Sequence, residues 1–184
     1  MSRTALLLID IQQGLDDTAY FGLRNNPQFE RNVAALLDGF RQAGTPVLHV
    51  QHHSLRPTSP LRPAQPGHDF KPEARPQEGE PIFAKTVNSA FIGTDLEAYL
   101  RQEGITRLVV AGLTTDHCVS TTVRMAGNLG FEVWLVGDAC AAFAKQSPEG
   151  MISADQVHRV HLASLSGEFC TVVSTQEALE RKWS

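Results

Sequence analysis

The sequence predicts a single-domain α/β protein built on a mostly parallel sheet with helices on both faces. Apolar runs of strand length alternate with segments of helical period along the chain, which is the pattern of βαβ units. The apolar runs are continuous rather than interrupted by polar residues, as expected for strands buried on both faces. With 184 residues, 42% hydrophobic and 20% charged, the chain is large enough for one globular core, so we take residues 1–184 as one domain.

Six apolar runs are predicted to be strands. In chain order they cover residues 5–11, 47–51, 82–84, 108–112, 133–137 and 169–173.

Helices are predicted between these runs from their periodicity and end signals. In the first, five apolar residues recur three or four apart, Asn26-Pro27 marks the start and Gly44 the stop. Capping-box patterns predict two further helix starts, at residues 94–97 and 153–156. Gly104 and Gly130 end helices, and residues 176–183 form a C-terminal helix that covers a sheet edge or meets a partner.

The segment 54–81 is predicted to be a long active-site loop or lid. It holds seven of the ten prolines and has almost no periodicity. It also leaves the carboxyl end of the second strand, where open α/β sheets bind ligands. A surface excursion with no part in binding is the alternative.

Composition excludes several classes of function. The net charge of −4 offers no basic face for nucleic acid or anionic lipid, and no apolar stretch approaches the ~20 residues that cross a bilayer. The first ten residues lack a cleavable signal, and three scattered cysteines do not form a disulfide framework. We expect a cytoplasmic protein with a small-molecule substrate and no nucleic-acid or membrane partner.

Three polar residues follow three of the predicted strands. Asp10 comes after Leu6-Leu7-Leu8-Ile9 at the carboxyl end of the first, Lys85 comes after the third, and Cys118 comes shortly after the fourth. A parallel sheet brings these carboxyl ends to one edge, where α/β enzymes place their sites, and a buried acid there needs a partner such as lysine. Taken singly, each has a structural alternative: a loop-capping acid, a solvated lysine and a buried apolar thiol.

The neighbours of Cys118 distinguish it from the other two cysteines. Turn residues 112–117 precede it and a helical pattern follows, with Asp116 as the predicted N-cap. Cys118 would then lie in the first turn of a helix, where free N–H groups and the helix dipole favour a thiolate or an oxyanion. Cys140 and Cys170 are predicted to be core residues.

With these residues in place, the chain resembles the isochorismatase-like cysteine hydrolases, which include nicotinamidases and related amidases. The resemblance rests on Leu8-Ile9-Asp10-Ile11-Gln12, on Lys85 followed by residues 87–91, and on residues 112–119, in that order over nearly the whole chain.

The resemblance implies a fold and a chemistry. It implies a three-layer α/β/α fold with a six-stranded, mostly parallel, Rossmann-like sheet, and a triad of Asp10, Lys85 and Cys118. It also implies a cis peptide bond between Leu113 and Thr114, with the N–H groups of Thr114 and Cys118 forming an oxyanion hole. The activity implied is hydrolysis of a small amide, ureido or lactam C–N bond through a thioester. Family members commonly form dimers or larger rings, so a homo-oligomer is expected.

The sequence departs from two branches of that family. Isochorismate-hydrolysing members characteristically lack the nucleophilic cysteine, which this chain has. Nicotinamidases carry a metal site with an Asp-x-His pattern after the second strand, whereas this chain reads Gln51-His52-His53, and a neutral amide is a weak ligand. His68 would complete a two- or three-histidine site with His52 and His53, but no tight spacing such as His-Glu-x-x-His supports it, so we expect no metal ion or other cofactor.

Residues of the pocket wall are predicted on separate grounds: Gln12 lies two residues beyond Asp10, Phe70 and Phe91 would supply apolar walls, and His53 would be a polar pocket residue. Gln12, His53, Phe70 and Phe91 are the candidates, each against an alternative of simple packing. His117 is assigned a supporting role beside the nucleophile. His158 and His161, three apart on a late helix, are predicted to be surface or interface residues.

Other readings of the chain are a metal-assisted nicotinamidase, an isochorismatase-type hydrolase, a redox protein, a nucleotide-binding module and a non-catalytic scaffold. The chain has no Cys-x-x-Cys motif and no Gly-x-Gly-x-x-Gly after the first strand, which disfavours the redox and nucleotide-binding readings.

Overall fold

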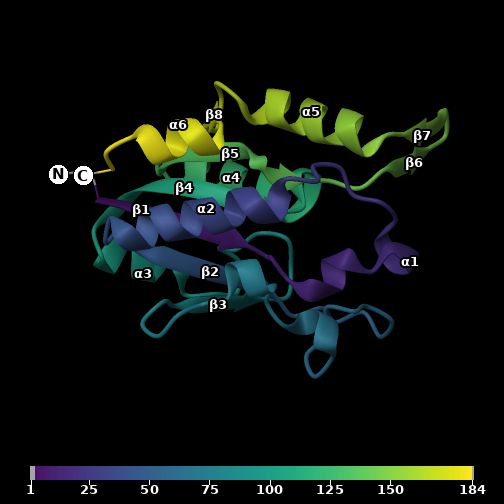
Figure 1. Ribbon diagram of the computed structural model, residues 1–184, viewed down its shortest axis with the longest axis horizontal. Helices are drawn as coiled ribbons and strands as arrows, with labels where there is room; N and C mark the ends of the chain where they lie inside the picture. Colours follow the sequence, from purple (N-terminus) through teal and green to yellow (C-terminus); the bar gives the residue numbers. More distant parts are fainter. Residues whose placement is uncertain (1–2, 184) are drawn as a thin grey trace.

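The computed structural model describes residues 3–183, and in it six strands form one sheet in the order β3-β2-β1-β4-β5-β8 (Figure 1). All five pairings are parallel, which confirms the predicted fold class. The strands are β1 (Arg3–Ile9), β2 (Val47–His52), β3 (Ile82–Lys85), β4 (Ile105–Leu113), β5 (Glu132–Ala141) and β8 (Thr171–Val173).

Helices cover both faces of this sheet and complete three layers. Helices α2 and α6 pack on one face, and α3, α4 and α5 pack on the other (Figure 1). The remaining helix, α1, is short. The bounds of the helices are α1 (Thr18–Phe21), α2 (Phe29–Gln42), α3 (Leu96–Gln102), α4 (Ser120–Asn128), α5 (Ala154–Leu165) and α6 (Thr175–Glu180).

The central strands explain why the apolar runs are continuous. In β1, Leu6 and Leu8 face the core under α2, whereas Leu7 and Ile9 face the core under α3 and α4. Because successive side chains of a strand point to opposite faces, a strand covered on both sides must be apolar at every position.

The start of α2 differs from the prediction. The helix begins at Phe29 rather than after Asn26, and its N-cap residue Gln28 makes no side-chain cap. The Asn26 amide instead donates to the backbone carbonyls of Asp138 and Cys140, at 2.8 and 2.9 Å. Asn26 therefore ties the approach to α2 to the end of β5.

Of the two predicted capping boxes, one forms. Ser153 and Gln156 satisfy each other's backbone donors at the start of α5. Thr94 does not do so at α3, because its hydroxyl donates to the carbonyl of Ala90 and the helix begins later, at Leu96. A further box, at the start of α6, went unpredicted.

A small antiparallel hairpin also went unpredicted. It consists of β6 (Lys145–Ser147) and β7 (Gly150–Ile152), and it projects beside α5 at one end of the molecule (Figure 1). Its strands of three residues carry no apolar run from which they would be predicted.

The segment 54–81 is more ordered than a structureless loop. It contains two short 3-10 helices, Pro66–His68 and Pro72–Ala74. Buried Lys71 pairs with Asp16 and Glu30, and the Gln13 N–H donates to the Asp69 carbonyl at 2.9 Å. These contacts fix the second half of the segment against the chain that follows β1.

Within residues 3–183, no helix has the length and apolar character needed to span a membrane.

Candidate active site

The structure brings Asp10, Lys85 and Cys118 together at the carboxyl edge of the sheet. Asp10 follows β1 and Cys118 follows β4, and the strand order reverses between these two neighbours. Such a reversal opens a crevice at the carboxyl ends of the strands, where ligands bind in open α/β sheets. Lys85 is the last residue of β3, at the sheet's edge.

Asp10 is buried, with 2% of its surface exposed, and it has a φ of 51°. That left-handed conformation is tolerated by aspartate and turns the chain out of β1, while the Asp10 N–H still donates to the Val50 carbonyl at 3.0 Å. Its Oδ2 accepts from Lys85 Nζ at 2.6 Å, and its Oδ1 has no partner among the described residues. One carboxylate oxygen is thus neutralised and the other is available to take a proton.

The ammonium of Lys85 lies at the centre of the site. It is 1% exposed and contacts Asp10 Oδ2, Cys118 Sγ at 3.3 Å and His52 Nδ1 at 3.2 Å. Asp10, His52 and Cys118 each place a potential metal-ligand atom within 4.8 Å of the others. The Lys85 ammonium already lies among these atoms, so a metal ion there would have to displace a buried cation.

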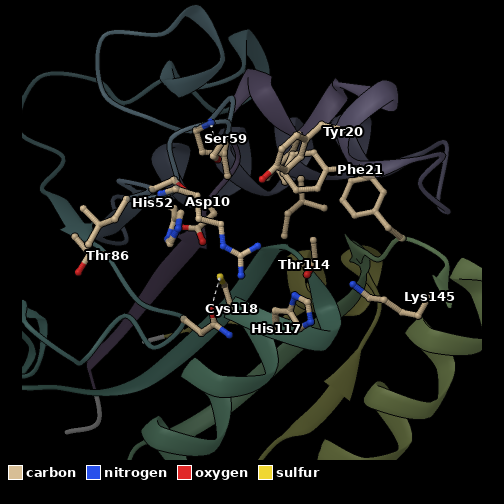
Figure 2. Close-up of a pocket in the computed structure, with 18 of the residues that line it drawn as sticks. Asp10, Tyr20, Phe21, His52, Ser59, Thr86, Thr114, His117, Cys118 and Lys145 are labelled. Carbon is tan, nitrogen blue, oxygen red and sulfur yellow. Dashed lines mark hydrogen bonds between the residues drawn. The ribbon is translucent and has the colours of Figure 1, made fainter. Parts of the chain in front are cut away.

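The turn before Cys118 differs from the predicted helix start. The Leu113–Thr114 peptide bond is cis, and residues Thr115–Val119 form one π-helical turn ahead of α4. The Thr114 carbonyl accepts from the N–H groups of His117 and Val119 at 3.1 and 3.2 Å. Cys118 lies between these two donors and projects into the crevice (Figure 2).

The predicted N-cap Asp116 does not cap this turn, because Thr114 stands at that position. Buried Asp116 instead lies 3.0 Å from Lys145 Nζ and 3.3 Å from His117 Nε2. Burial alone would raise the pKa of Asp116, but the hydrogen bond from Lys145 and the charge of His117 hold it below its usual value. Asp116 thereby joins the β6 hairpin to the turn that carries Cys118.

A second histidine also supports this turn. His158, predicted to be a surface or interface residue, places Nδ1 2.8 Å from the Thr115 hydroxyl and so connects α5 to the segment that carries Cys118.

Burial raises the pKa of the Cys118 thiol well above its usual value, and the Asp10 carboxylate raises it further against the opposing charge of Lys85. The resting group is therefore a thiol, not the thiolate that a helix start would favour. A nucleophilic role for Cys118 would require a base to remove this proton, and Asp10 lies beside it.

Gly112 allows β4 to approach β1 next to the site. It has a φ of 138°, and a Cβ there would lie 2.1 Å from the Ile9 carbonyl oxygen. The β4–β5 register shifts at the same place. Glycine is required here because neither the conformation nor the space admits a side chain.

A cavity of about 670 Å³ opens over the three residues. This volume suits a small-molecule site. Figure 2 shows Asp10 and His52 on one side of Cys118, His117 on the other, and Tyr20 and Phe21 across the cavity. The lining also includes Ser54, Leu55, Arg56, Ser59 and Leu61, from the first part of the 54–81 segment, with Asn88, Phe143, Ala144 and Lys145.

The four residues predicted for the pocket wall do not line this cavity. Gln12 is fully buried, and its amide bonds the backbone of His52 and His68. Phe70 forms a bridge to Gln12 and packs edge-on against His49.

Phe91 stacks on Phe131 at 5.9 Å between ring centroids, inside the core under α3 and α4. His53 packs against His68, with ring centroids 4.6 Å apart. The sequence did not identify the cavity wall, because each of these four side chains packs away from the cavity.

The residues at the place of the nicotinamidase metal do not fit a metal ion. Gln51, His53 and His68 do meet there, but the Gln51 amide nitrogen donates to the His68 carbonyl at 2.9 Å and faces His68 Nδ1 at 3.5 Å. The cluster therefore has two imidazoles, a neutral amide with its donor directed inward and no carboxylate. A divalent cation would find no negative ligand in this set.

Comparisons with known proteins agree with this fold and arrangement. A family model described as an Isochorismatase domain matches residues 4–177, and the chain belongs to the isochorismatase family of hydrolases.

A solved protein of this family from Chromobacterium violaceum is 51% identical, with a TM-score of 0.92 over 96% of this chain and 92% of that one. The uncharacterised family protein YrdC of Bacillus subtilis is 42% identical over 96% of this chain and 95% of its own. The ureidoacrylate amidohydrolase RutB of Variovorax paradoxus is 28% identical over 75% of this chain and 68% of its own.

Proposed function

We propose that this protein is a cysteine-dependent hydrolase of a small C–N bond in an amide, ureido compound or lactam. The observation that carries the proposal is the buried ammonium of Lys85, which contacts both Asp10 and the Cys118 sulfur beneath a cavity of small-molecule size. A nucleophile, a base within reach and a charge that orients them are the parts that thiol catalysis requires.

In the first half-reaction, Asp10 takes the Cys118 proton as the sulfur attacks the substrate carbonyl. The C–S bond forms, and the carbonyl oxygen becomes an oxyanion held by the N–H groups of Thr114 and Cys118. Each such donor typically contributes about 3–4 kcal/mol to the transition state. Protonated Asp10 then gives its proton to the leaving nitrogen, the C–N bond breaks and an acyl thioester remains.

In the second half-reaction, Asp10 removes a proton from water, which attacks the thioester. The C–S bond breaks, the acid product forms, and the proton returns to sulfur. Lys85 keeps its charge throughout and stabilises whichever of its two partners is anionic.

The lining of the cavity supports a substrate that carries a carboxylate. Its one acid, Asp10, is paired with Lys85, and Lys145 is paired with Asp116. Arg56 also lines the cavity, and its guanidinium has no hydrogen bond or ion pair within residues 3–183. An arginine fork matches a carboxylate, so ureido acids and amides of acids are the first substrates to examine.

We propose that the reaction needs no metal. The Gln51, His53 and His68 set lacks a carboxylate, and Lys85 lies among the potential ligand atoms of the triad. This argues against the metal-assisted nicotinamidase, and Cys118 argues against the isochorismatase-type reaction. The contacts of buried Lys85 with Asp10, His52 and Cys118 argue against a non-catalytic scaffold.

The test is a screen of primary amides, ureido acids and lactams for product release, with Cys118→Ala as the blank. We expect Cys118→Ala to abolish turnover and iodoacetamide to inactivate the wild-type enzyme through Cys118. Cys170→Ala is the matched control, because Cys170 lies away from the cavity, and it should keep full activity. Full activity in Cys118→Ala would end the proposal.

A further inference from the structure

Lys85 reaches its catalytic partners across the end of a neighbouring strand. It leaves β3 at the edge of the sheet, whereas Asp10 follows β1, two strands away, and β2 lies between them. Parallel strands are about 4.8 Å apart, so the backbones of Lys85 and Asp10 are about 10 Å apart in that direction, a distance that the two side chains span together. On the way it passes His52, the last residue of β2, whose register partner is Lys85 itself.

The contacts at Lys85 Nζ use all the donors of an ammonium. A lysine ammonium has three N–H groups, and Nζ has three acceptors: Asp10 Oδ2 at 2.6 Å, His52 Nδ1 at 3.2 Å and Cys118 Sγ at 3.3 Å. Since Nζ only donates, the Nδ1 of His52 must carry the lone pair. The imidazole is then neutral, with its proton on Nε2.

A buried side chain holds His52 in this place. The Gln12 amide accepts from the His52 N–H at 2.8 Å and donates to the His52 carbonyl at 3.2 Å and to the His68 carbonyl at 2.8 Å. Gln12 therefore fixes the end of β2 relative to the chain that follows β1. This contact gives fully buried Gln12 a structural role away from the cavity.

We propose that His52 is a positioning residue for the hydrolase reaction: its neutral imidazole binds the third N–H of Lys85 and so directs the other two at Asp10 and at the Cys118 sulfur. The inference rests on the proposed function. His52 acts through Lys85, so its loss is felt at the nucleophile rather than in the binding of substrate.

The surroundings keep the imidazole neutral at ordinary pH. Burial lowers the pKa of His52, and the charge of Lys85 lowers it further. His53 and Arg56 act in the same direction, and Asp10 alone opposes them. The group is therefore an acceptor under the conditions in which the enzyme would be assayed.

Two substitutions separate positioning from packing. His52→Leu fills a similar space without an acceptor, and it leaves one buried ammonium N–H unpaired. His52→Asn places Oδ1 at the same distance from the backbone as Nδ1, so an acceptor remains. We expect His52→Leu to lower kcat by about 10- to 100-fold with little change in KM, and His52→Asn to recover most of that loss. The inference would be overturned if His52→Leu kept the wild-type kcat, or if the kcat of His52→Asn were no higher than that of His52→Leu.

A second measurement does not depend on substrate. The rate of Cys118 alkylation by iodoacetamide at pH 8 reports how well Lys85 stabilises the sulfur anion, with Lys85→Met as the lower limit and Cys118→Ala as the background. We expect His52→Leu to react about tenfold more slowly than wild type, and His52→Asn to react within about threefold of it. His53→Asn is the matched control, because the His53 side chain packs against His68 outside the cavity, and it should react at the wild-type rate.

The two proposals fail in different ways. If Cys118 is alkylated at the wild-type rate in both His52 variants, the positioning role is overturned and the proposed function still stands. Full turnover by Cys118→Ala in the substrate screen overturns the nucleophile and, with it, the inference that rests on it.

Discussion

Gly112→Ala is predicted to be among the most damaging single-methyl changes in this chain. Two terms add. A non-glycine residue at a φ of 138° is strained by about 1–2 kcal/mol, and the new Cβ would lie 2.1 Å from the Ile9 carbonyl oxygen and 2.7 Å from the Ile9 nitrogen. Overpacking of this kind costs typically about 1–3 kcal/mol when the neighbour can move. Here the neighbour is backbone of the central strand, so we expect a total loss of about 3–5 kcal/mol.

Gly130→Ala is the matched control for the strain alone. Gly130 also has a positive φ, of 85°, but an added Cβ would meet no atom within 4 Å. Its expected cost is therefore only about 1–2 kcal/mol. Urea denaturation of the reduced protein at 25 °C measures both free energies of unfolding.

The difference between the two variants isolates the close approach of β4 to β1. Because Asp10 follows Ile9, the displaced backbone of Gly112→Ala should also slow alkylation of Cys118, whereas Gly130→Ala should leave that rate unchanged. Equal losses of stability in the two variants would refute the reasoning, since they would show that β1 and β4 separate at no cost.

Two further predictions concern charge. Arg56→Gln should raise KM about tenfold for an amide substrate that bears a carboxylate and should leave KM for its uncharged analogue nearly unchanged; an equal change for both would remove Arg56 from recognition. Burial alone would raise the pKa of Glu80, but hydrogen bonds from Arg41, the Gln77 N–H and His49 lower it from 4.5 to about 2. Because the folded-state pKa is depressed, the stability that these hydrogen bonds contribute is present above pH 4.5 and is lost as the pH falls from 4.5 to 2. Glu80→Gln should therefore be less stable than wild type at pH 7 and should lose less stability over that acid range; parallel pH profiles of the two proteins would contradict this.

The parts of the site that the sequence predicts are those fixed by strand order. Asp10, Lys85 and Cys118 each stand just after an apolar run, and any parallel sheet built from those runs brings its carboxyl ends to one edge. Whether the three side chains meet depends on their distance along that edge. In the structure, Lys85 Nζ lies 2.6 Å from Asp10 Oδ2 and 3.3 Å from Cys118 Sγ.

His52 shows why other parts were missed. The sequence offers it only as a possible metal ligand with His53 and His68, because it stands where nicotinamidases carry their metal pattern. Its contact with Lys85 depends on the pairing of β2 with β3 and on their register, which are nonlocal properties. The sequence does carry one signal for this role: His52 ends the strand that lies between those of Asp10 and Lys85.

The cavity wall was missed for a related reason. Arg56 and Ser59 lie in a proline-rich segment without periodicity, and Lys145 lies in a hairpin of three-residue strands. No repeat pattern fixes the direction of such side chains. Conversely, Phe91 lies close to Lys85 in sequence, but the turn that follows β3 sends it into the core against Phe131.

Substrate recognition and the proposed chemistry lie on different parts of the chain, because the first part of the 54–81 segment lines the cavity and the strand ends carry the reacting groups. The proposed reacting groups are attached to β1, β3 and the turn after β4, whereas residues 54–61 supply part of the wall, and residues 55–58 within them are exposed. The second half of the segment is anchored separately through Lys71, so its fold does not depend on what residues 55–58 are. A combinatorial library confined to residues 55–58 should therefore change substrate preference while the stability of the protein stays nearly constant. Selection from such a library would act on substrate recognition and leave Asp10, Lys85 and Cys118 unchanged.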